Sequence, residues 1–184
     1  MSTPPDINIV RQKIDRPIVL VGMMAAGKSR LGRELSKTLK LPFFDTDKRI
    51  EEEADRTIAG IFEAEGEQGF RDREARMIAH DLSGQPGARV VSTGGGAILR
   101  PESADLIFGK TISIWLRASV ETIIERTSRR TDRPLLKNVD QAKVLREMAE
   151  RRYPIYERAT FAIDTDHGDS GITLDAILQK LNSL

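Results

Sequence analysis

Cysteine is absent from the 184-residue sequence. Its absence excludes disulfide bonds, thiolate catalysis and zinc sites built on cysteine, and it fits the reducing cytosol. Long apolar runs are also missing, since runs such as Ile18–Val21 and Ile112–Leu116 are far shorter than the roughly 20 residues of a membrane-spanning helix. We therefore expect a cytoplasmic protein without membrane association.

The first sixteen residues lack the apolar stretch of a signal peptide, and they contain Asp6 and Asp15. Pro4 and Pro5 disfavour regular structure near the start of the chain. We interpret residues 1–16 as a flexible N-terminal tail without a signal peptide. Residues 17–184 are interpreted as one domain, because that length is usual for a single compact unit.

An excess of charge of one sign is missing as well. Lys and Arg together number 29 and Asp and Glu number 28, which gives a formal net charge of +1. A protein that binds duplex nucleic acid needs many unbalanced cations, so this composition argues against nucleic acid as a partner. We expect a monomer that acts on a small molecule, and any recognition of anions has to be local.

Short apolar runs bounded by turn residues predict five strands. Ile18–Val21 is rich in β-branched residues and ends at Gly22, which is typical of a buried parallel strand. The other predicted strands are Phe43–Phe44, Arg89–Ser92, Thr111–Leu116 and about Phe161–Ile163.

Helical patterns lie between these strands. They comprise a stretch with Leu31, Leu35 and Leu39 at four-residue spacing, two or three helices within Lys48–Leu82 with breaks near Gly60 and Gly66–Gly69, and helices at Val120–Arg130, Gln141–Arg152 and Leu174–Leu181. The alternation predicts an α/β fold, a doubly wound, five-stranded parallel sheet with helices on both faces. Ligands of such sheets bind beyond the carboxyl ends of the strands.

The segment after the first strand, Gly22-Met-Met-Ala-Ala-Gly27-Lys28-Ser29, fits the pattern G-x-x-x-x-G-K-[ST] between a strand and a helix. Backbone N–H groups and the helix N-terminus of such a loop bind phosphate, the lysine reaches the outer phosphates, and the hydroxyl holds Mg²⁺. The motif therefore predicts a bound nucleotide with Mg²⁺, and the alternative is a chance Gly-rich turn. By itself it does not separate kinases from ATPases, GTPases or regulatory modules. The residues expected to contact the nucleotide are Gly22, Ala25, Ala26, Gly27, Lys28, Ser29 and Arg30.

Ala25 departs from the pattern of many small-molecule kinases, which have another glycine at this position of the loop. We expect a stiffer or slightly displaced loop that still binds nucleotide, because the other motif residues are present.

Asp45 and Asp47 come at the end of the second predicted strand. Two carboxylates two residues apart point the same way in an extended chain. One is a candidate for holding a metal-linked water, and the other for holding or deprotonating an acceptor hydroxyl. The alternative is that an aspartate here caps a helix.

Three glycines, Gly94-Gly-Gly96, follow the third predicted strand and would let a substrate lie against the backbone, although such a run is also found in flexible turns. Arginine suits bidentate binding of carboxylates and phosphates, and Arg126, Arg133 and Arg152 are candidates for it. The alternative for each arginine is a solvated surface position.

Taken in order, these segments resemble the shikimate kinase family. The resemblance runs from about Pro17 to Leu181. It is carried by Gly22–Ser29, called the phosphate loop below, and by Asp45-Thr-Asp47, Phe70-Arg71 with Glu74, Gly94-Gly-Gly96, Arg133-Pro-Leu-Leu136 and Arg152-x-Pro-x-Tyr156. Ser92 stands where a generic P-loop ATPase has an acidic residue, and shikimate kinases have a similar non-acidic position.

The resemblance implies a P-loop kinase with a mobile lid at about residues 126–140. This family phosphorylates the 3-hydroxyl of shikimate with ATP, a step toward the aromatic amino acids. By resemblance, Lys28 and Ser29 contact the phosphates and Mg²⁺, Asp45 supports the metal through water, and Asp47 meets the acceptor hydroxyls.

The resemblance also assigns the acceptor site and the lid. It places the substrate carboxylate on Arg71 and Arg152, and the substrate ring against Gly94, Gly95 and Gly96. Arg126 would lie near the adenine, and Arg133 would move in with the lid to touch the transferring phosphate. The expected catalytic residues are Lys28, Asp47 and Arg133.

Two other functions stay open. A kinase of the same fold that acts on gluconate or a nucleoside monophosphate would not need an arginine pair beside Asp47. A regulatory module that binds nucleotide without transferring phosphate is left open by Ala25. We expect neither a metal site nor catalysis at Glu51–Glu53, His80 or His167, since the glutamates fit a solvated helix face and the histidines are isolated.

Overall fold

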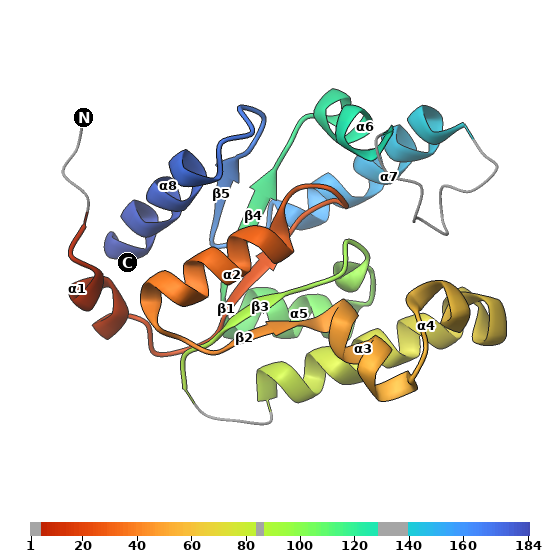
Figure 1. Cartoon of the computed structure of the whole chain (residues 1–184), viewed down its shortest axis with the longest axis horizontal. Helices are drawn as coiled ribbons and strands as arrows, with labels where there is room; N and C mark the ends of the chain where they lie inside the picture. Colours follow the sequence, from red (N-terminus) through yellow and green to blue (C-terminus); the bar gives the residue numbers. More distant parts are fainter. Residues whose placement is uncertain (1–4, 84–86, 129–139) are drawn as a thin grey trace.

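Five parallel strands form the central sheet of the molecule (Figure 1). The computed structural model describes residues 5–83, 87–128 and 140–184. Within them the strands are β1 (Ile18–Val21), β2 (Phe43–Asp45), β3 (Val90–Ser92), β4 (Ile112–Arg117) and β5 (Phe161–Asp164). Their order is β2-β3-β1-β4-β5. The predicted five-stranded parallel sheet is confirmed.

Strand β1 lies at the centre of the sheet, and all four of its residues are buried. It pairs with β3 on one side and β4 on the other, so that Leu20 lies opposite Ser92 and Ile114. A strand covered on both faces needs a continuous apolar run, as β1 has. The strand order reverses beside β1, where open α/β sheets bind their ligands.

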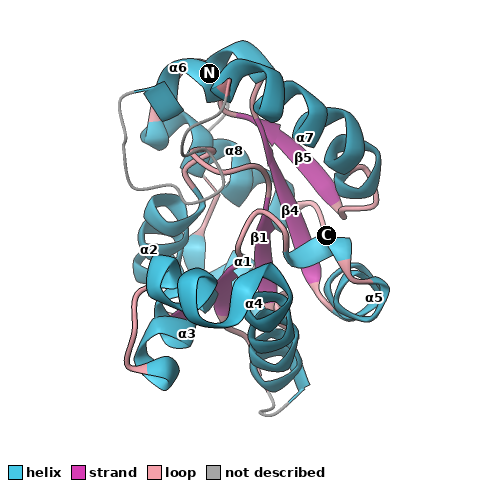
Figure 2. Cartoon of the chain, turned by 90° about the vertical axis from the view of Figure 1, so that its right-hand side faces the viewer, coloured by secondary structure: helices cyan, strands magenta, loops and turns pink. Residues whose placement is uncertain are grey.

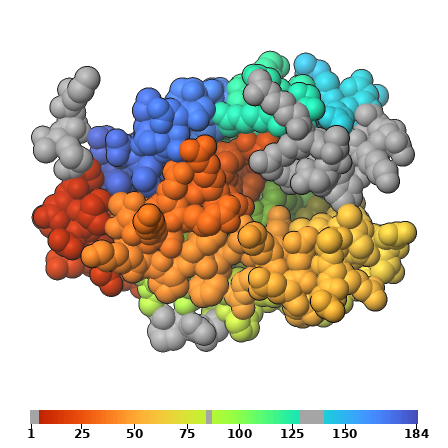
Figure 3. Space-filling view, viewed as in Figure 1, coloured from red at the N-terminus to blue at the C-terminus, as the bar shows by residue number. Residues whose placement is uncertain are grey.

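The helices are α1 (Ile7–Gln12), α2 (Lys28–Leu39), α3 (Thr46–Ala54), α4 (Ile58–Ser83), α5 (Pro101–Lys110), α6 (Val120–Ser128), α7 (Gln141–Tyr156) and α8 (Ser170–Asn182), with a 3₁₀ turn η1 at Ala97–Leu99. Helices α1, α2 and α8 contact one another, and in Figure 1 α2 lies in front of the sheet with α1 and α8 at the left. Helix α5 lies behind the sheet and contacts α4 and β4. Figure 2 shows the strands between α2 on one side and α5 and α7 on the other. In the space-filling view, α2 separates α8 from α3 (Figure 3). None of the helices in the described ranges has the length and apolar character to span a membrane.

Helices α3 and α4 are held together apart from the main core. Ile50, Ile61, Phe70 and Met77 form a second apolar cluster between them. The break predicted near Gly66–Gly69 occurs at Gly66, where φ is 71° and ψ is −178°, whereas Gly60 lies inside α4 without a break. Because α3 carries Asp47 and α4 carries Arg71, this packing fixes the spacing of two predicted site residues.

The structure corrects part of the predicted N-terminal tail. Asp6 caps a helix at Ile7–Gln12 by accepting a hydrogen bond from the Asn8 N–H. Val10 is fully buried and Ile14 is 7% exposed, and α1 contacts α2 and α8. Ile7 and Val10 lie three residues apart on one face of this helix, and Ile14 follows just beyond its end. This short signal was overlooked beside the two prolines.

The remaining differences from the prediction concern two helices and the lid. Helix α5 was not predicted, although Pro101 occupies the first helical position, which proline favours. Helix α7 continues past Arg152 to Tyr156 in spite of Pro154. Most of the predicted lid, residues 129–139, lies outside the described residues, and Arg133 lies there too.

Candidate active site

The phosphate loop joins the end of β1 to the start of α2. Gly22 has a φ of 142°, and a Cβ added to it would lie 2.7 Å from the Leu116 carbonyl oxygen. Gly27 has a φ of 94° and occupies the N-cap of α2. Only glycine meets both requirements without strain, so the motif glycines shape this loop as predicted.

Lys28 is buried at the base of the loop. Its Nζ donates hydrogen bonds to the carbonyl oxygens of Gly22 and Met23, each at 2.8 Å. The ammonium group is therefore held at the loop that the motif assigns to phosphate, beside the N-terminus of α2, whose dipole also favours an anion.

Ala25 adopts a left-handed conformation, with a φ of 60°. The loop therefore takes a shape that favours glycine although an alanine stands there. An L-residue with a Cβ pays about 1–2 kcal/mol for this conformation, so the departure seen in the sequence appears as local backbone strain.

Oxygen donors gather at the carboxyl ends of β2 and β3. The hydroxyl oxygens of Ser29 and Ser92 lie 3.4 Å apart, and Asp45 pairs with Ser92 in the strand register. The Thr46 hydroxyl donates to the Ser92 carbonyl oxygen at 3.0 Å. Hydroxyl and carboxylate oxygens are donors that suit Mg²⁺.

This donor set is small. In the parts of the chain that the structure describes, there is no group of three or more His, Asp or Glu side chains that could enclose a metal. Mg²⁺ takes one or two protein ligands and completes its shell with phosphate oxygens and water in nucleotide sites. The residues present therefore fit a metal that arrives with a nucleotide.

Asp45 and Asp47 do not share an extended strand, so the predicted geometry is wrong. Strand β2 ends at Asp45, which caps α3 by accepting a hydrogen bond from the Lys48 N–H at 3.4 Å. Asp47 lies in the first turn of α3. The two carboxylates still belong to one site, because Asp45 adjoins Ser92 and Asp47 faces Gly94.

The three glycines of the loop after β3 are each closed in by other side chains. A Cβ added to Gly94 would lie 2.8 Å from Asp47 Oδ1 and would clash with Glu74 Oε1. A Cβ on Gly96 would clash with the Arg71 guanidinium. The glycine loop, Gly94–Gly96, is therefore the surface around which α3 and α4 place their charged groups.

Gly95 connects this loop to the phosphate loop and to α7. A Cβ on Gly95 would lie 3.2 Å from the Met24 backbone nitrogen and 3.5 Å from Arg152 Nη1. Arg152 Nη1 also donates a hydrogen bond to the Gly95 carbonyl oxygen at 3.1 Å. The predicted acceptor residues Asp47, Arg71 and Arg152 are therefore brought together beside the phosphate loop.

Of the two arginines of this site, Arg152 is buried and the Arg71 side chain is 11% exposed. Arg71 Nη1 donates to Glu74 Oε2 at 2.7 Å, and its Nη2 donates to Glu67 at 3.2 Å. Burial lowers the pKa of Arg152, and the nearby Arg71 charge lowers it further. A desolvated pair of guanidinium groups is a favourable site for a carboxylate.

Glu74 is the carboxylate that already accompanies this pair. It is 2% exposed, and its Oε1 has no hydrogen-bond partner among the described residues. Burial raises the pKa of Glu74, although Arg71 opposes the shift. An unsatisfied buried oxygen is costly, so Oε1 is an open acceptor held against Gly94.

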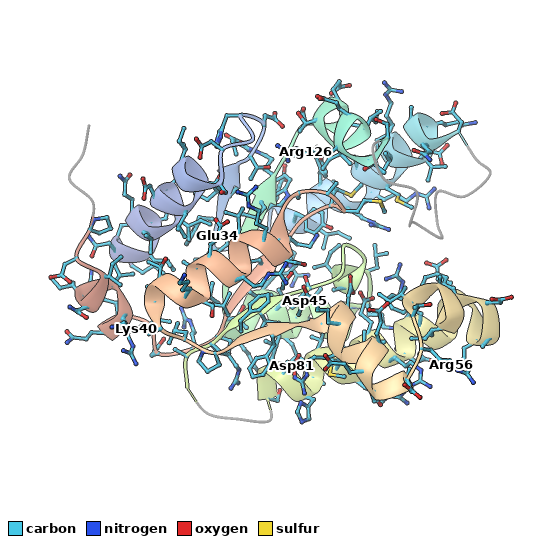
Figure 4. The ribbon with its side chains drawn as sticks, in the orientation of Figure 1. Glu34, Lys40, Asp45, Arg56, Asp81 and Arg126 are labelled. Carbon is cyan, nitrogen blue, oxygen red and sulfur yellow. The ribbon has the colours of Figure 1, made fainter. Side chains whose placement is uncertain are left out.

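A pocket of about 170 Å³ lies on the other side of the phosphate loop. Arg30 and Arg126 line it. So do Thr165, Gly168 and Asp169 of the loop after β5, and Ser170 and Thr173 in the first turn of α8. Arg126 Nη2 donates to the Thr165 carbonyl oxygen, and Arg30 Nη2 donates to the Ser170 hydroxyl at 2.8 Å. In Figure 4 Arg126 and Asp45 lie on either side of the phosphate loop. The pocket is suited to the nucleoside part of ATP.

The sequence model of the family described as shikimate kinase matches residues 24–182. This chain belongs to the shikimate kinase family. It is 48% identical to the shikimate kinase of Rhodopseudomonas palustris over 88% of this chain and 78% of that one. It is 44% identical to the shikimate kinase of Pseudomonas syringae over 92% of this chain and 98% of that one.

Solved structures of shikimate kinases have the same fold as this chain. The shikimate kinase from Acinetobacter baumannii in complex with shikimate superposes with a TM-score of 0.85 at 37% identity, covering 91% of this chain and 93% of that one. The shikimate kinase from Aquifex aeolicus has a TM-score of 0.79 at 30% identity, covering 91% and 96%. A gluconokinase from Sinorhizobium meliloti, with a TM-score of 0.55 at 16% identity, shares the fold alone.

Several residues at this site of the shikimate kinase fold were missed from sequence. Glu74 was quoted as part of a motif but given no role, and Tyr156 likewise. The residues after β5 that line the pocket beside the phosphate loop belong to no sequence motif. They follow the carboxyl end of a strand, at the same edge of the sheet as the phosphate loop, and this position is the one signal that could have found them.

Proposed function

We propose that this kinase transfers the γ-phosphoryl group of ATP to the 3-hydroxyl of shikimate and forms shikimate 3-phosphate, a step toward the aromatic amino acids. The observation that carries the proposal is the glycine loop. Gly94 lies against Asp47 and Glu74, Gly95 against Arg152 and the phosphate loop, and Gly96 against Arg71.

At the nucleotide end, the N–H groups of the phosphate loop and Lys28 would bind the β- and γ-phosphates, with Arg30 and Arg126 beside the nucleoside. Ser29 and Asp45 would hold Mg²⁺, the latter through water. The bound ion would neutralise charge on the phosphates during transfer.

At the acceptor end, the guanidinium groups of Arg71 and Arg152 would bind the shikimate carboxylate. That contact would turn the ring toward Gly94–Gly96 and its 3-hydroxyl toward Asp47. Asp47 would accept a hydrogen bond from this hydroxyl. The hydroxyl oxygen would bond to the γ-phosphorus as the bond from phosphorus to ADP breaks, and the hydroxyl proton would pass to water, through Asp47 or directly. Phosphoryl transfer depends mainly on such alignment and on charge stabilisation.

Arg133 and the lid at about residues 126–140 complete the proposal. Arg133 would contact the transferring phosphate, a role that is worth about 10³–10⁵ in rate in other phosphoryl-transfer enzymes, while a closed lid would exclude water as a competing acceptor. We further propose that the enzyme works as a cytoplasmic monomer, without nucleic acid or membrane partners, in keeping with its nearly balanced charge.

The test is ADP release by the purified protein with ATP and Mg²⁺ and a panel of acceptors. We expect ADP and shikimate 3-phosphate only when shikimate is added. Equal ADP release with gluconate, with a nucleoside monophosphate or with no acceptor would overturn the substrate assignment. Binding of ATP without transfer to any acceptor would favour the regulatory module instead.

A further inference from the structure

The Tyr156 hydroxyl is attached to the glycine loop. Tyr156 is the last residue of α7 and is 1% exposed. Its hydroxyl donates a hydrogen bond of 2.6 Å to the Gly95 carbonyl oxygen, which also accepts from Arg152. The Tyr156 ring stacks on Trp115 of β4, with centroids 5.7 Å apart and planes inclined by 26°. The ring is therefore fixed, and so is the direction of its hydroxyl.

The Gly95 carbonyl is the point at which α7 holds this loop. The carbonyls of Gly94 and Gly96 accept hydrogen bonds within their own turn, from Ala97 and Leu99. Glycine has no side chain and the widest backbone freedom, so the conformation of the loop depends on backbone contacts of this kind. Two donors on one helix, one turn apart, therefore set the orientation of the Gly95 peptide.

We propose that Tyr156 is a positioning residue for the acceptor site, whose hydroxyl holds the Gly95 carbonyl and so keeps Arg152 directed at the acceptor carboxylate. The proposal rests on the proposed function, because it assumes that Arg152 binds the carboxylate of shikimate. With Tyr156 in place, Arg152 shares the carbonyl at one of its nitrogens and keeps its other donors for substrate. Without the hydroxyl, Arg152 alone restrains the peptide.

Deprotonation does not interrupt this contact in the neutral range. Burial raises the pKa of the Tyr156 hydroxyl above its ordinary value, although the Arg152 charge opposes the shift. The hydroxyl therefore keeps its proton and remains a donor throughout the neutral range, where kinases are assayed.

The test is Tyr156→Phe, which removes the hydroxyl and keeps the ring on Trp115. We expect KM for shikimate to rise about threefold to tenfold, the range given by the loss of one buried hydrogen bond. KM for ATP should change less than about twofold, because the pocket for the nucleoside is lined by other elements. Equal changes in both constants, or an unchanged KM for shikimate, would overturn the proposal.

Tyr153→Phe is the matched control. Tyr153 lies on the same helix and packs edge-on against the same Trp115 at 5.3 Å. Its hydroxyl also donates a 2.6 Å hydrogen bond to a backbone carbonyl, that of Ala118, outside the glycine loop. A stability loss common to both variants would be structural. A rise in KM for shikimate of the same size in Tyr153→Phe would contradict a special role for Tyr156.

A double variant tests whether Tyr156 acts through Arg152. Arg152→Lys keeps the charge but lacks the planar fork, so it should itself raise KM for shikimate. In that background, we expect Tyr156→Phe to add less than about twofold, since coupled residues are not additive. Fully additive effects would overturn the proposed route. If the wild-type chain phosphorylates a different carboxylate-bearing acceptor, the function fails, and the same variants assayed with that acceptor still decide the role of Tyr156.

Discussion

Glu74 binds Arg71 through one carboxylate oxygen, at 2.7 Å, and turns the other toward Gly94. One buried side chain thus touches both the guanidinium proposed for the substrate carboxylate and the loop proposed for the substrate ring. Its position explains how an arginine on α4 is kept in one orientation beside a loop that has no side chains of its own.

Glu74→Gln should lower kcat/KM for shikimate about tenfold to hundredfold, the value of a lost charge-assisted hydrogen bond. The amide keeps the shape of the side chain but not its charge. The matched control is Glu67→Gln, because Glu67 also bonds Arg71 but is 58% exposed, and an exposed pair contributes little. Steady-state kinetics with both variants check this, and similar losses in both would contradict a distinct role for Glu74.

The same residue should make stability depend on pH. Because burial raises the pKa of Glu74, the native state binds more protons than the unfolded state above the ordinary glutamate pKa of about 4.3. Its contribution to stability is therefore greatest below that pH and falls as the pH rises through the raised pKa. Tm measured for wild type and Glu74→Gln between about pH 4 and pH 7 should shift in favour of the variant as pH rises, and a constant difference would contradict the shift.

Gly94→Ala should inactivate the enzyme without unfolding it. The new Cβ would meet Glu74 Oε1 and Asp47 Oδ1, and displacing such groups by about 1 Å can cost roughly hundredfold in rate. Gly109→Ala is the control, because Gly109 lies in α5 with no atom within 4 Å of an added Cβ. That variant should keep full activity and gain about 0.5–1 kcal/mol of stability. Substantial activity in Gly94→Ala would show that the glycine loop is not closely packed.

Much of the site could be predicted because its motifs follow strands. Gly22, Ser92 and Gly94 each lie at or just after the carboxyl end of a parallel strand, and those ends meet at one edge of the sheet. Local sequence is enough to place such residues. Local sequence did not show where β2 ends. Asp45 and Asp47 were therefore predicted to lie on one strand, although a helix begins at Thr46.

The roles of Glu74 and Tyr156 could not be predicted in the same way. Each depends on how closely a helix approaches the glycine loop, and that distance is set by packing between segments far apart in the chain. The buried face of α1 was overlooked for a different reason. A helix of six residues has fewer than two turns, so its apolar residues recur too few times to reveal a helical period.

Val10→Ala tests the corrected N-terminus. Val10 is fully buried in the main core, so the variant should lose about 2 kcal/mol of unfolding free energy in urea, with both KM values unchanged. Ile9→Ala is the control from the same helix, since Ile9 is 50% exposed, and it should cost less than about 0.5 kcal/mol. Small and equal effects would restore the flexible tail expected from the sequence.

Ala25→Gly tests the strain in the phosphate loop. Ala25 has a φ of 60°, so glycine would relieve about 1–2 kcal/mol of native-state strain, against about 0.4–1 kcal/mol of added freedom in the unfolded chain. The variant should be more stable by up to about 1.5 kcal/mol. KM for ATP should stay within about threefold of wild type, because the loop already has the shape that glycine prefers. Ala26→Gly should do the opposite, since Ala26 is 1% exposed and its φ is not positive. If urea unfolding showed that both variants change the unfolding free energy in the same direction, Ala25 would not be strained. Ala25 could then not explain a difference in nucleotide affinity between this enzyme and kinases with glycine at that position.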